Sequence, residues 1–244
     1  MRSRAWVTWV GATIFCFGAL SQVAVADGPS GSAPGKGAAA KADADPPTTK
    51  VKIAISPSEV AWGIDEKQLI AIYDKVIDAD FAERYKKVQP GPDMQALDAE
   101  VQQQKDAFRN SKVVFDKAPT GIDSTPLKGE YAYGNKESLM RITRAAKTRD
   151  FFFVGGHLWK VVDELPLGEK AMWGRDFQEA TGKVGVAYGI AGRARGADTA
   201  NGRSFSEVDW QDATTQVRAV DWGNGRFALV FQDKKGKPSV PKTK

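Results

Sequence analysis

The amino-acid sequence predicts an α+β fold: a mainly antiparallel sheet with one packed helix, preceded by a helical N-terminal segment. Apolar residues recur at helical spacing between residues 58 and 111, whereas short aromatic and β-branched runs separated by glycine turns fill residues 112–232. The runs follow one another directly, and one helical stretch alone interrupts them. Neighbouring strands are therefore expected to pair antiparallel, within a single domain over residues 51–232.

The first 26 residues have the pattern of a cleavable secretory signal peptide. Arg2 and Arg4 precede an apolar run from Ala5 to Leu20, and Ala24 and Ala26 form an A-x-A cleavage site. A membrane-spanning helix is the alternative, but the run has 16 residues, whereas a span needs about 20. We expect cleavage after Ala26, no transmembrane segment after processing, and a protein that works in the periplasm or outside the cell.

Cys16, the only cysteine, lies inside this apolar run. Lipid anchoring is the alternative, but its pattern has Gly, Ala or Ser directly before the cysteine, where this chain has Phe15. Cys16 is therefore expected to leave with the signal peptide. The mature chain would then have no disulfide and no thiol nucleophile.

Two segments outside the domain are predicted to be disordered. Residues 27–50 are rich in Gly, Ala, Pro, Ser and Lys and form a tether, and residues 233–244 form a basic tail with five Lys against one Asp. The formal net charge is +5, but the signal peptide holds two of these charges and the tail four, which leaves −1 for residues 51–232. A nucleic-acid-binding domain carries its basic excess on a structured face, so no nucleic-acid partner is expected.

The helical segment, residues 58–111, begins with a strong capping signal. Asp65 is followed three residues later by Gln68, which predicts a capping box, and apolar residues then recur at helical spacing from Leu69 to Val76. The polar triplet Asp78-Ala79-Asp80 predicts a break in this helix. A further helix is expected from about Asp93 to Asn110, with one apolar stripe on an otherwise polar surface.

The strand-rich part begins with two predicted hairpins. Glu130–Tyr133 is expected to pair with Ser138–Thr143 around Gly134-Asn135. Phe151–Val154 and Leu158–Val162 meet across Gly155-Gly156, a sequence suited to a two-residue turn that needs positive φ. This second hairpin is expected to be the central element of the sheet.

The turn at Gly155-Gly156 sets the register of the central hairpin. It pairs Val154 with His157, Phe153 with Leu158, and Phe152 with Trp159. Val161 then shares a face with Trp159, and Val162 lies on the other face. Both faces are apolar, so both are expected to be covered, one by a late helix and the other by the front helices or a second sheet layer.

The late helix is predicted over Phe177–Tyr188, with Asp176 as its cap and Gly189 at its end. Three strands are expected after it, near Phe205–Trp210, Thr214–Trp222 and Arg226–Gln232.

Several of these features together resemble a known group of proteins. Trp62-Gly63 before a capped helix, the aromatic strand, the glycine turn and Leu158-Trp159-Lys160-Val161 resemble uncharacterised secreted proteins of myxobacteria and their relatives, as do Glu130–Tyr133 and Glu137-Ser138. The resemblance covers residues 58–232. It implies export and an unassigned role, and it supplies no catalytic residues.

No residue pattern amounts to a catalytic, metal or cofactor signature. His157 is the only histidine and directly follows a turn, and zinc of the usual kind needs several His or Cys ligands. Asp74, Asp78, Asp80 and Glu83 lie close in sequence but lack the glycine and the spacing of an EF-hand loop. We expect no cofactor, and we expect these residues to form a solvated helix junction with a capping Asp.

Two functions remain open. A non-enzymatic binding protein for an envelope protein or a glycan would use an aromatic patch of Trp159, Trp210 and Trp222, although such residues also serve as core. The alternative is a hydrolase of cell-wall or extracellular polymer, which would use the neighbouring carboxylates Asp163 and Glu164. Export and the missing catalytic set favour the binding protein.

Overall fold

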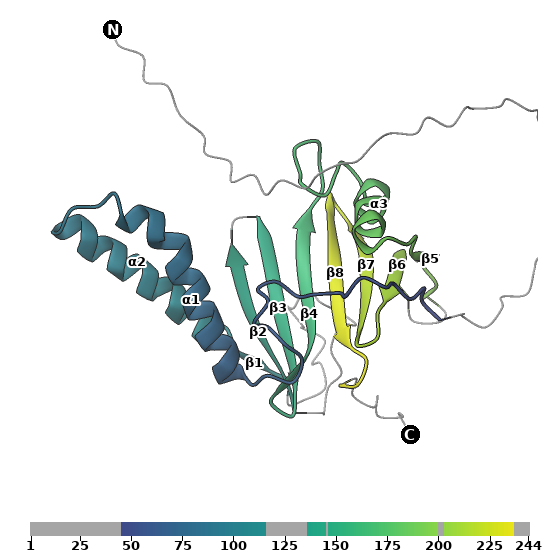
Figure 1. Ribbon diagram of the computed structural model, residues 1–244, viewed down its shortest axis with the longest axis horizontal. Coiled ribbons are helices and arrows are strands. Elements are labelled where there is room, and N and C mark those ends of the chain that lie inside the picture. The colour runs from purple at the N-terminus through teal and green to yellow at the C-terminus, as the bar shows by residue number, and fades with distance from the viewer. Residues whose placement is uncertain (1–44, 116–135, 145, 200–202, 237–244) are drawn as a thin grey trace, which may run out of the picture. The chain divides into compact units, whose positions relative to one another are not determined.

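A computed structural model describes residues 45–115, 136–144, 146–199 and 203–236. These residues form three helices and an eight-stranded antiparallel sheet with the order β1-β2-β3-β4-β8-β7-β6-β5 (Figure 1). The α+β class with a mainly antiparallel sheet is confirmed. The predicted signal peptide, residues 27–44 of the tether and residues 237–244 of the tail lie outside the described residues.

The helices are α1 (Glu66–Tyr85), α2 (Pro92–Arg109) and α3 (Phe177–Tyr188). The strands are β1 (Val113–Val114), β2 (Glu137–Arg144), β3 (Lys147–Val154), β4 (His157–Pro166), β5 (Arg193–Arg195), β6 (Glu207–Gln211), β7 (Thr215–Gly223) and β8 (Arg226–Asp233). In the described part of the chain, no helix combines the length and apolar character that crossing a membrane requires.

The first helix is longer than the sequence predicted. Asp65 and Gln68 form the expected capping box, but α1 continues through Asp78–Asp80, so the predicted break is wrong. Ile77 and Phe81 on either side of the triplet are buried, whereas its three residues are exposed. The aspartates therefore lie on the solvent side of an uninterrupted helix, where their low helix propensity costs little.

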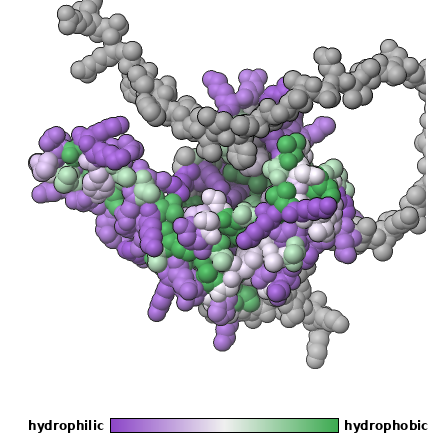
Figure 2. Space-filling model, in the orientation of Figure 1, coloured by the Kyte–Doolittle hydropathy of each residue, from purple (hydrophilic) through white to green (hydrophobic). Residues whose placement is uncertain are grey.

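The two front helices pack as a pair beside the sheet, and their outer surface is largely hydrophilic (Figure 2). On α2, Leu97, Val101 and Phe108 are buried, which confirms the predicted apolar stripe. The pair thus covers part of the sheet with one apolar side and presents charged residues to solvent.

The central hairpin is formed by β3 and β4, and its register differs from the prediction at one residue. Val154 pairs with His157 and Phe153 with Leu158, as expected, but Phe152 pairs with Lys160 and not with Trp159. Trp159 is the extra residue of a β-bulge. A bulge shifts the alternation of every later residue, so Val161 and Val162 exchange the faces that the sequence assigned to them.

Both faces of the hairpin are buried, as the three consecutive phenylalanines predicted. Phe151 and Phe153 belong to the cluster on the face that carries the helices, and Phe152 belongs to the cluster on the opposite face. All three have an exposed fraction of 0%. The hairpin is therefore central to the core.

The late helix does not pack where it was predicted. The rings of Tyr73 (α1) and Phe108 (α2) lie 5.1 and 6.1 Å from the ring of Phe151, so the front helices cover the hairpin. By contrast, α3 lies over the C-terminal strands, with Phe177 6.4 Å from Phe227 of β8. β8 lies beside β4, and β7, β6 and β5 follow it in the sheet, so α3 packs on these C-terminal strands. Buried residues of all three helices belong to the same hydrophobic cluster.

One boundary also needs correction. Thr48 bridges to Gln211, and the amide of Thr49 donates to the Gln211 carbonyl at 2.8 Å, so the last residues of the predicted tether belong to the folded domain. In addition, β2 pairs with β3 through the turn after Arg144. Its predicted partner, Glu130–Tyr133, lies outside the described residues.

Candidate functional site

The three tryptophans of the predicted aromatic patch do not share a surface. Trp210 is fully buried on the helix-covered face, and its Nε1 donates to the Ile190 carbonyl at 3.2 Å. Trp159 and Trp222 lie on the opposite face, where Trp159 is buried and Trp222 is half-buried. Trp210 is therefore a core residue, and the described structure offers no common aromatic patch of these three.

The two carboxylates of the hydrolase hypothesis point away from each other. Asp163 pairs with Leu229 on the helix-covered face, whereas Glu164 pairs with Ala228 on the opposite face and forms an ion pair with Arg226. Adjacent residues of a strand point to opposite faces. They therefore do not converge on one substrate, which glycosidase chemistry requires.

The acidic residues of α1 have cationic partners. Asp74 pairs with Arg109 at 2.6 Å, Asp78 with Lys105 at 2.6 Å, Glu83 with Lys86 at 2.6 Å, and Asp80 with Arg144. Among the described residues no group of three or more His, Cys, Asp or Glu side chains gathers as a metal site would. His157 is exposed, and its Nδ1 lies 3.0 Å from the Gly63 carbonyl, so it ties the hairpin tip to the start of α1.

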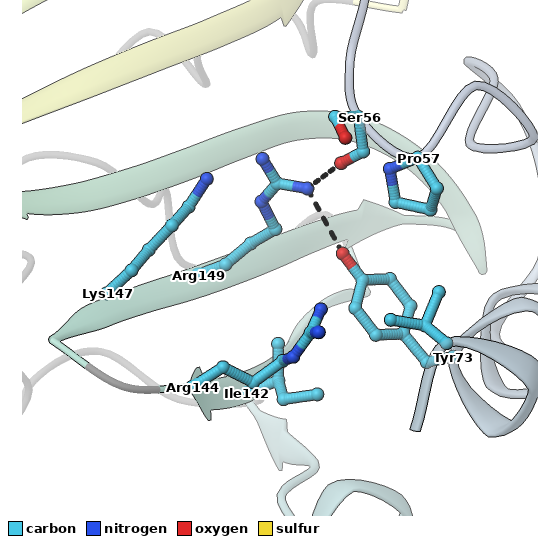
Figure 3. A pocket seen from close by; sticks show the side chains of 8 residues that line it. Ser56, Pro57, Tyr73, Ile142, Arg144, Lys147 and Arg149 are labelled. Carbon is cyan, nitrogen blue, oxygen red and sulfur yellow. Dashed lines mark hydrogen bonds between the residues drawn. The ribbon is translucent and has the colours of Figure 1, made fainter. Parts of the chain in front are cut away.

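The strongest candidate site is a cavity of about 180 Å³ between α1, the β2–β3 hairpin and the loop at Ser56. We call it the Arg149 pocket. Its lining residues are Ser56, Pro57, Tyr73, Val76, Ile142, Arg144, Lys147 and Arg149. Figure 3 shows Arg149 between Lys147 on one side and Tyr73 on the other.

Strand alternation gathers the cations of the pocket. Ile142 pairs with Arg149 and Arg144 pairs with Lys147 across the β2–β3 hairpin, and paired residues share a face. Arg149 also pairs with Asp163 of β4, which brings a carboxylate to the same face. Four side chains of one hairpin and an acid from the next strand therefore meet under α1.

Arg149 forms the floor of the pocket and is fully engaged. Its Nε and Nη2 donate to the two carboxylate oxygens of Asp163 at 2.5 and 2.6 Å, a bidentate pair in which both side chains are buried. Its Nη1 donates to the Ser56 carbonyl and, at 3.1 Å, to the Tyr73 hydroxyl. These bonds lock the loop, α1, β3 and β4 together.

Burial shifts the pKa values of the groups around this floor. Burial raises the pKa of the Tyr73 hydroxyl, and the charge of Arg149 offsets part of the rise. Burial lowers the pKa of the Lys147 ammonium, and the charge of Asp163 offsets part of the fall. For Arg149, the hydrogen bonds and charge of Asp163 outweigh burial and raise its pKa. At neutral pH the site therefore holds a neutral phenol beside charged guanidinium groups.

The charged groups of the site leave an excess of positive charge. Arg144, Lys147 and Arg149 face Asp163 and, through Arg144, the exposed Asp80. Three cations against two carboxylates leave one positive charge. Both carboxylates are already engaged, so the arrangement favours a ligand that brings its own negative charge.

A larger hollow of about 590 Å³ lies between α3 and the β5–β6 edge. Its lining includes the apolar Ile190 and Val208 and the polar Gln178 and Thr181, and none of its lining residues is charged. Specific sites combine apolar walls with a few polar groups that fix orientation. The smaller Arg149 pocket adds charged side chains to its apolar walls, which the larger hollow does not, and it is therefore the candidate site.

Sequence reasoning missed the cations of this pocket. The sequence did contain a signal. Lys147 and Arg149 lie at alternate positions of one strand and so share a face, and Arg144 lies just before that strand. Tyr73 and Ser56 carry no comparable signal, because they reach the pocket only through the packing of α1 and its preceding loop.

Comparison of the chain with protein-family models, with curated proteins and with solved structures found no match. The resemblance to secreted proteins of myxobacteria therefore stays a prediction.

Proposed function

We propose that this protein is an exported, non-enzymatic binding protein of the envelope or the extracellular space, and that the Arg149 pocket is its ligand site. The ligand carries a negatively charged group, either free or as part of an envelope protein or glycan. The proposal combines the secretory pattern of residues 1–26 with the chemistry of the pocket.

The observation that carries the binding site is the unbalanced charge inside a walled cavity. Arg144 and Lys147 line the pocket, while Arg149 at its floor donates hydrogen bonds to both carboxylate oxygens of Asp163. No lining residue is a carboxylate, a histidine or a cysteine, so the described lining lacks the pair of carboxylates that the hydrolase alternative would use. This favours binding over the hydrolase alternative, which no described geometry supports.

Thermal unfolding in the presence of small anions, cations and neutral molecules tests the binding site. A ligand that binds only the native state raises the stability by about 2.7 kcal/mol at a concentration 100 times its Kd. We expect anions to raise the Tm of residues 27–244, and we expect the double variant Arg144→Gln/Lys147→Gln to lose this effect.

The matched control is Arg84→Gln, which removes an exposed arginine on α1 that pairs with Glu100 and does not line the pocket. It should respond to anions as the unaltered chain does. Equal Tm shifts in the control and in the double variant would contradict the proposed site, because the anions would then act elsewhere.

Export has a separate test. The full chain, expressed in a bacterium with a secretory pathway, should be recovered outside the cytoplasm with Asp27 as its first residue, as read by the intact mass of the purified protein. Recovery in the cytoplasm with residues 1–26 still attached would contradict export and would leave the pocket untouched.

A further inference from the structure

We infer that the ligand of the Arg149 pocket is a small organic carboxylate with an apolar body. Its carboxylate binds Arg144 and Lys147, and its body lies against Val76 and Ile142. This inference rests on the proposed function, because it names the chemical class that the same pocket would select.

The size of the cavity limits the ligand. The pocket holds about 180 Å³, and a cavity of about 150 Å³ is large enough for a benzene molecule. A single ring, or an aliphatic chain of similar volume, together with one carboxylate therefore fills the space. A nucleotide or a sugar polymer would place most of its surface outside.

The walls of the cavity favour an apolar body. Pro57, Val76 and Ile142 line the pocket together with the ring of Tyr73. A hydrated inorganic anion such as phosphate would leave this surface wet, whereas an aromatic or aliphatic body would remove it from water. Each Å² of apolar surface removed from water contributes about 25 cal/mol, so the walls discriminate between the two kinds of anion.

Two cations are available to reorient toward a ligand. The side chains of Arg144 and Lys147 are each 40% exposed, whereas that of Arg149 is 8% exposed and held by four hydrogen bonds. Arg144 pairs with the exposed Asp80, and an exposed pair of this kind contributes little stability. Arg144 can therefore leave Asp80 and bind a ligand at a small cost in free energy.

Lys147 is available for a different reason. Its Nζ lies 2.7 Å from Oδ2 of Asp163. The same carboxylate accepts two hydrogen bonds from Arg149, one at each oxygen. When Lys147 moves to a ligand carboxylate, Asp163 keeps its bidentate partner and stays neutralised. The Lys147 charge is thus the excess charge of the site.

Tyr73 adds a neutral donor to this arrangement. Its hydroxyl oxygen accepts a hydrogen bond from Arg149 at 3.1 Å, so the hydroxyl proton remains to be donated. Figure 3 shows the hydroxyl beside Arg149 at the centre of the pocket. A carboxylate accepts several hydrogen bonds at once, which matches a site built from two cations and one hydroxyl.

Isothermal titration calorimetry with three probes tests the inference: benzoate, benzamide and inorganic phosphate, at equal ionic strength. Benzamide has the shape of benzoate without its charge. A charge-assisted hydrogen bond contributes about 1.5–3 kcal/mol, so benzoate should bind residues 27–244 at least about tenfold more tightly than benzamide. Phosphate should bind more weakly than benzoate, because it leaves the apolar walls unused.

Three variants locate the binding. Lys147→Gln and Arg144→Gln should each weaken benzoate about tenfold or more. Val76→Ser should weaken benzoate but leave the affinity for acetate, which has no ring, unchanged. Arg84→Gln is the control and should bind benzoate as the unaltered chain does, and circular dichroism spectra should show that all four variants are folded.

The possible results distinguish the class of ligand from the location of the binding site. Phosphate, or an oligosaccharide carrying uronic acids, binding more tightly than benzoate and requiring Lys147 would overturn the ligand class while keeping the site. Equal affinities for benzoate and benzamide would also overturn the ligand class. If no anion binds in a manner that depends on Arg144 or Lys147, the proposed function of the pocket fails as well.

Discussion

The hydroxyl of Tyr73 on α1 lies 3.1 Å from Nη1 of Arg149 on β3, 76 residues further along the chain. The ring of Tyr73 also packs 5.1 Å from the ring of Phe151, two residues beyond Arg149 on the same face. One side chain of α1 therefore contacts both the hydrophobic core and the floor of the candidate site. The floor of the pocket, Arg149, is therefore held by a side chain that also packs in the core.

The buried ion pair beneath the pocket should be sensitive to the loss of one partner. Asp163→Asn leaves the buried Arg149 guanidinium without its carboxylate, which typically costs about 3–5 kcal/mol. Chemical denaturation measures the change in the free energy of unfolding. The control Glu100→Gln removes the partner of Arg84 in an exposed pair and should cost about 1 kcal/mol or less. Equal losses in both variants would mean that the Asp163 pair is not buried in solution.

The central hairpin supplies a test of the core. Phe153 has an exposed fraction of 0%, so Phe153→Ala should lower the free energy of unfolding by about 3–5 kcal/mol. Phe205 is 40% exposed, and Phe205→Ala should cost far less, within about 0.5 kcal/mol. A loss below about 1 kcal/mol for Phe153→Ala, measured by urea denaturation, would contradict the central position of the hairpin.

The sequence predicted those features that depend on neighbouring residues. The capping box of Asp65, the turn at Gly155-Gly156 and the end of α3 at Gly189 each follow from local backbone and hydrogen-bond rules, and each is present. The central hairpin was placed correctly because its apolar residues fill both faces. Local chemistry thus gave the elements and the fold class.

The features that were missed depend on contacts between distant parts of the chain. The bulge at Trp159 could not be read from alternation, because the residues around it are compatible with either register. The Arg149 pocket needs Tyr73 from α1 and Ser56 from the preceding loop, and no local pattern relates these to β3. Trp210 gave no sign in the sequence that it packs against Tyr188 in the core.

Alkaline pH should destabilise the protein through Tyr188. Burial, with a further contribution from Asp212, raises the pKa of its hydroxyl to about 12, whereas an unfolded tyrosine has a pKa of about 10. The native state therefore keeps a proton that the unfolded state loses, so stability falls as pH rises from about 10 to about 12, by about 2–3 kcal/mol. Urea denaturation as a function of pH measures this fall.

The variant Tyr188→Phe has no proton to lose at this position. It should show a smaller fall in stability over the same pH range, since the other tyrosines still titrate. An unchanged pH profile in this variant would show that Tyr188 is not responsible for the alkaline loss.

Binding should also depend on pH through Lys147. This lysine faces Asp163, Arg149, Arg144 and Tyr73, and its burial lowers its pKa, so it loses its charge below the ordinary lysine value of about 10.4. Affinity for benzoate should fall as pH rises through that lowered pKa. Lys147→Arg should keep its affinity at the same pH, because arginine stays charged. A parallel fall in this variant would assign the titration to another group.

The most direct measurement is a crystal structure of residues 27–244 grown with benzoate. Benzoate should lie in the Arg149 pocket, with its carboxylate oxygens within hydrogen-bond distance of Arg144 and Lys147 and its ring against Val76 and Ile142. An empty or collapsed Arg149 pocket, with benzoate bound at another surface or not at all, would contradict the proposal that this pocket is the ligand site.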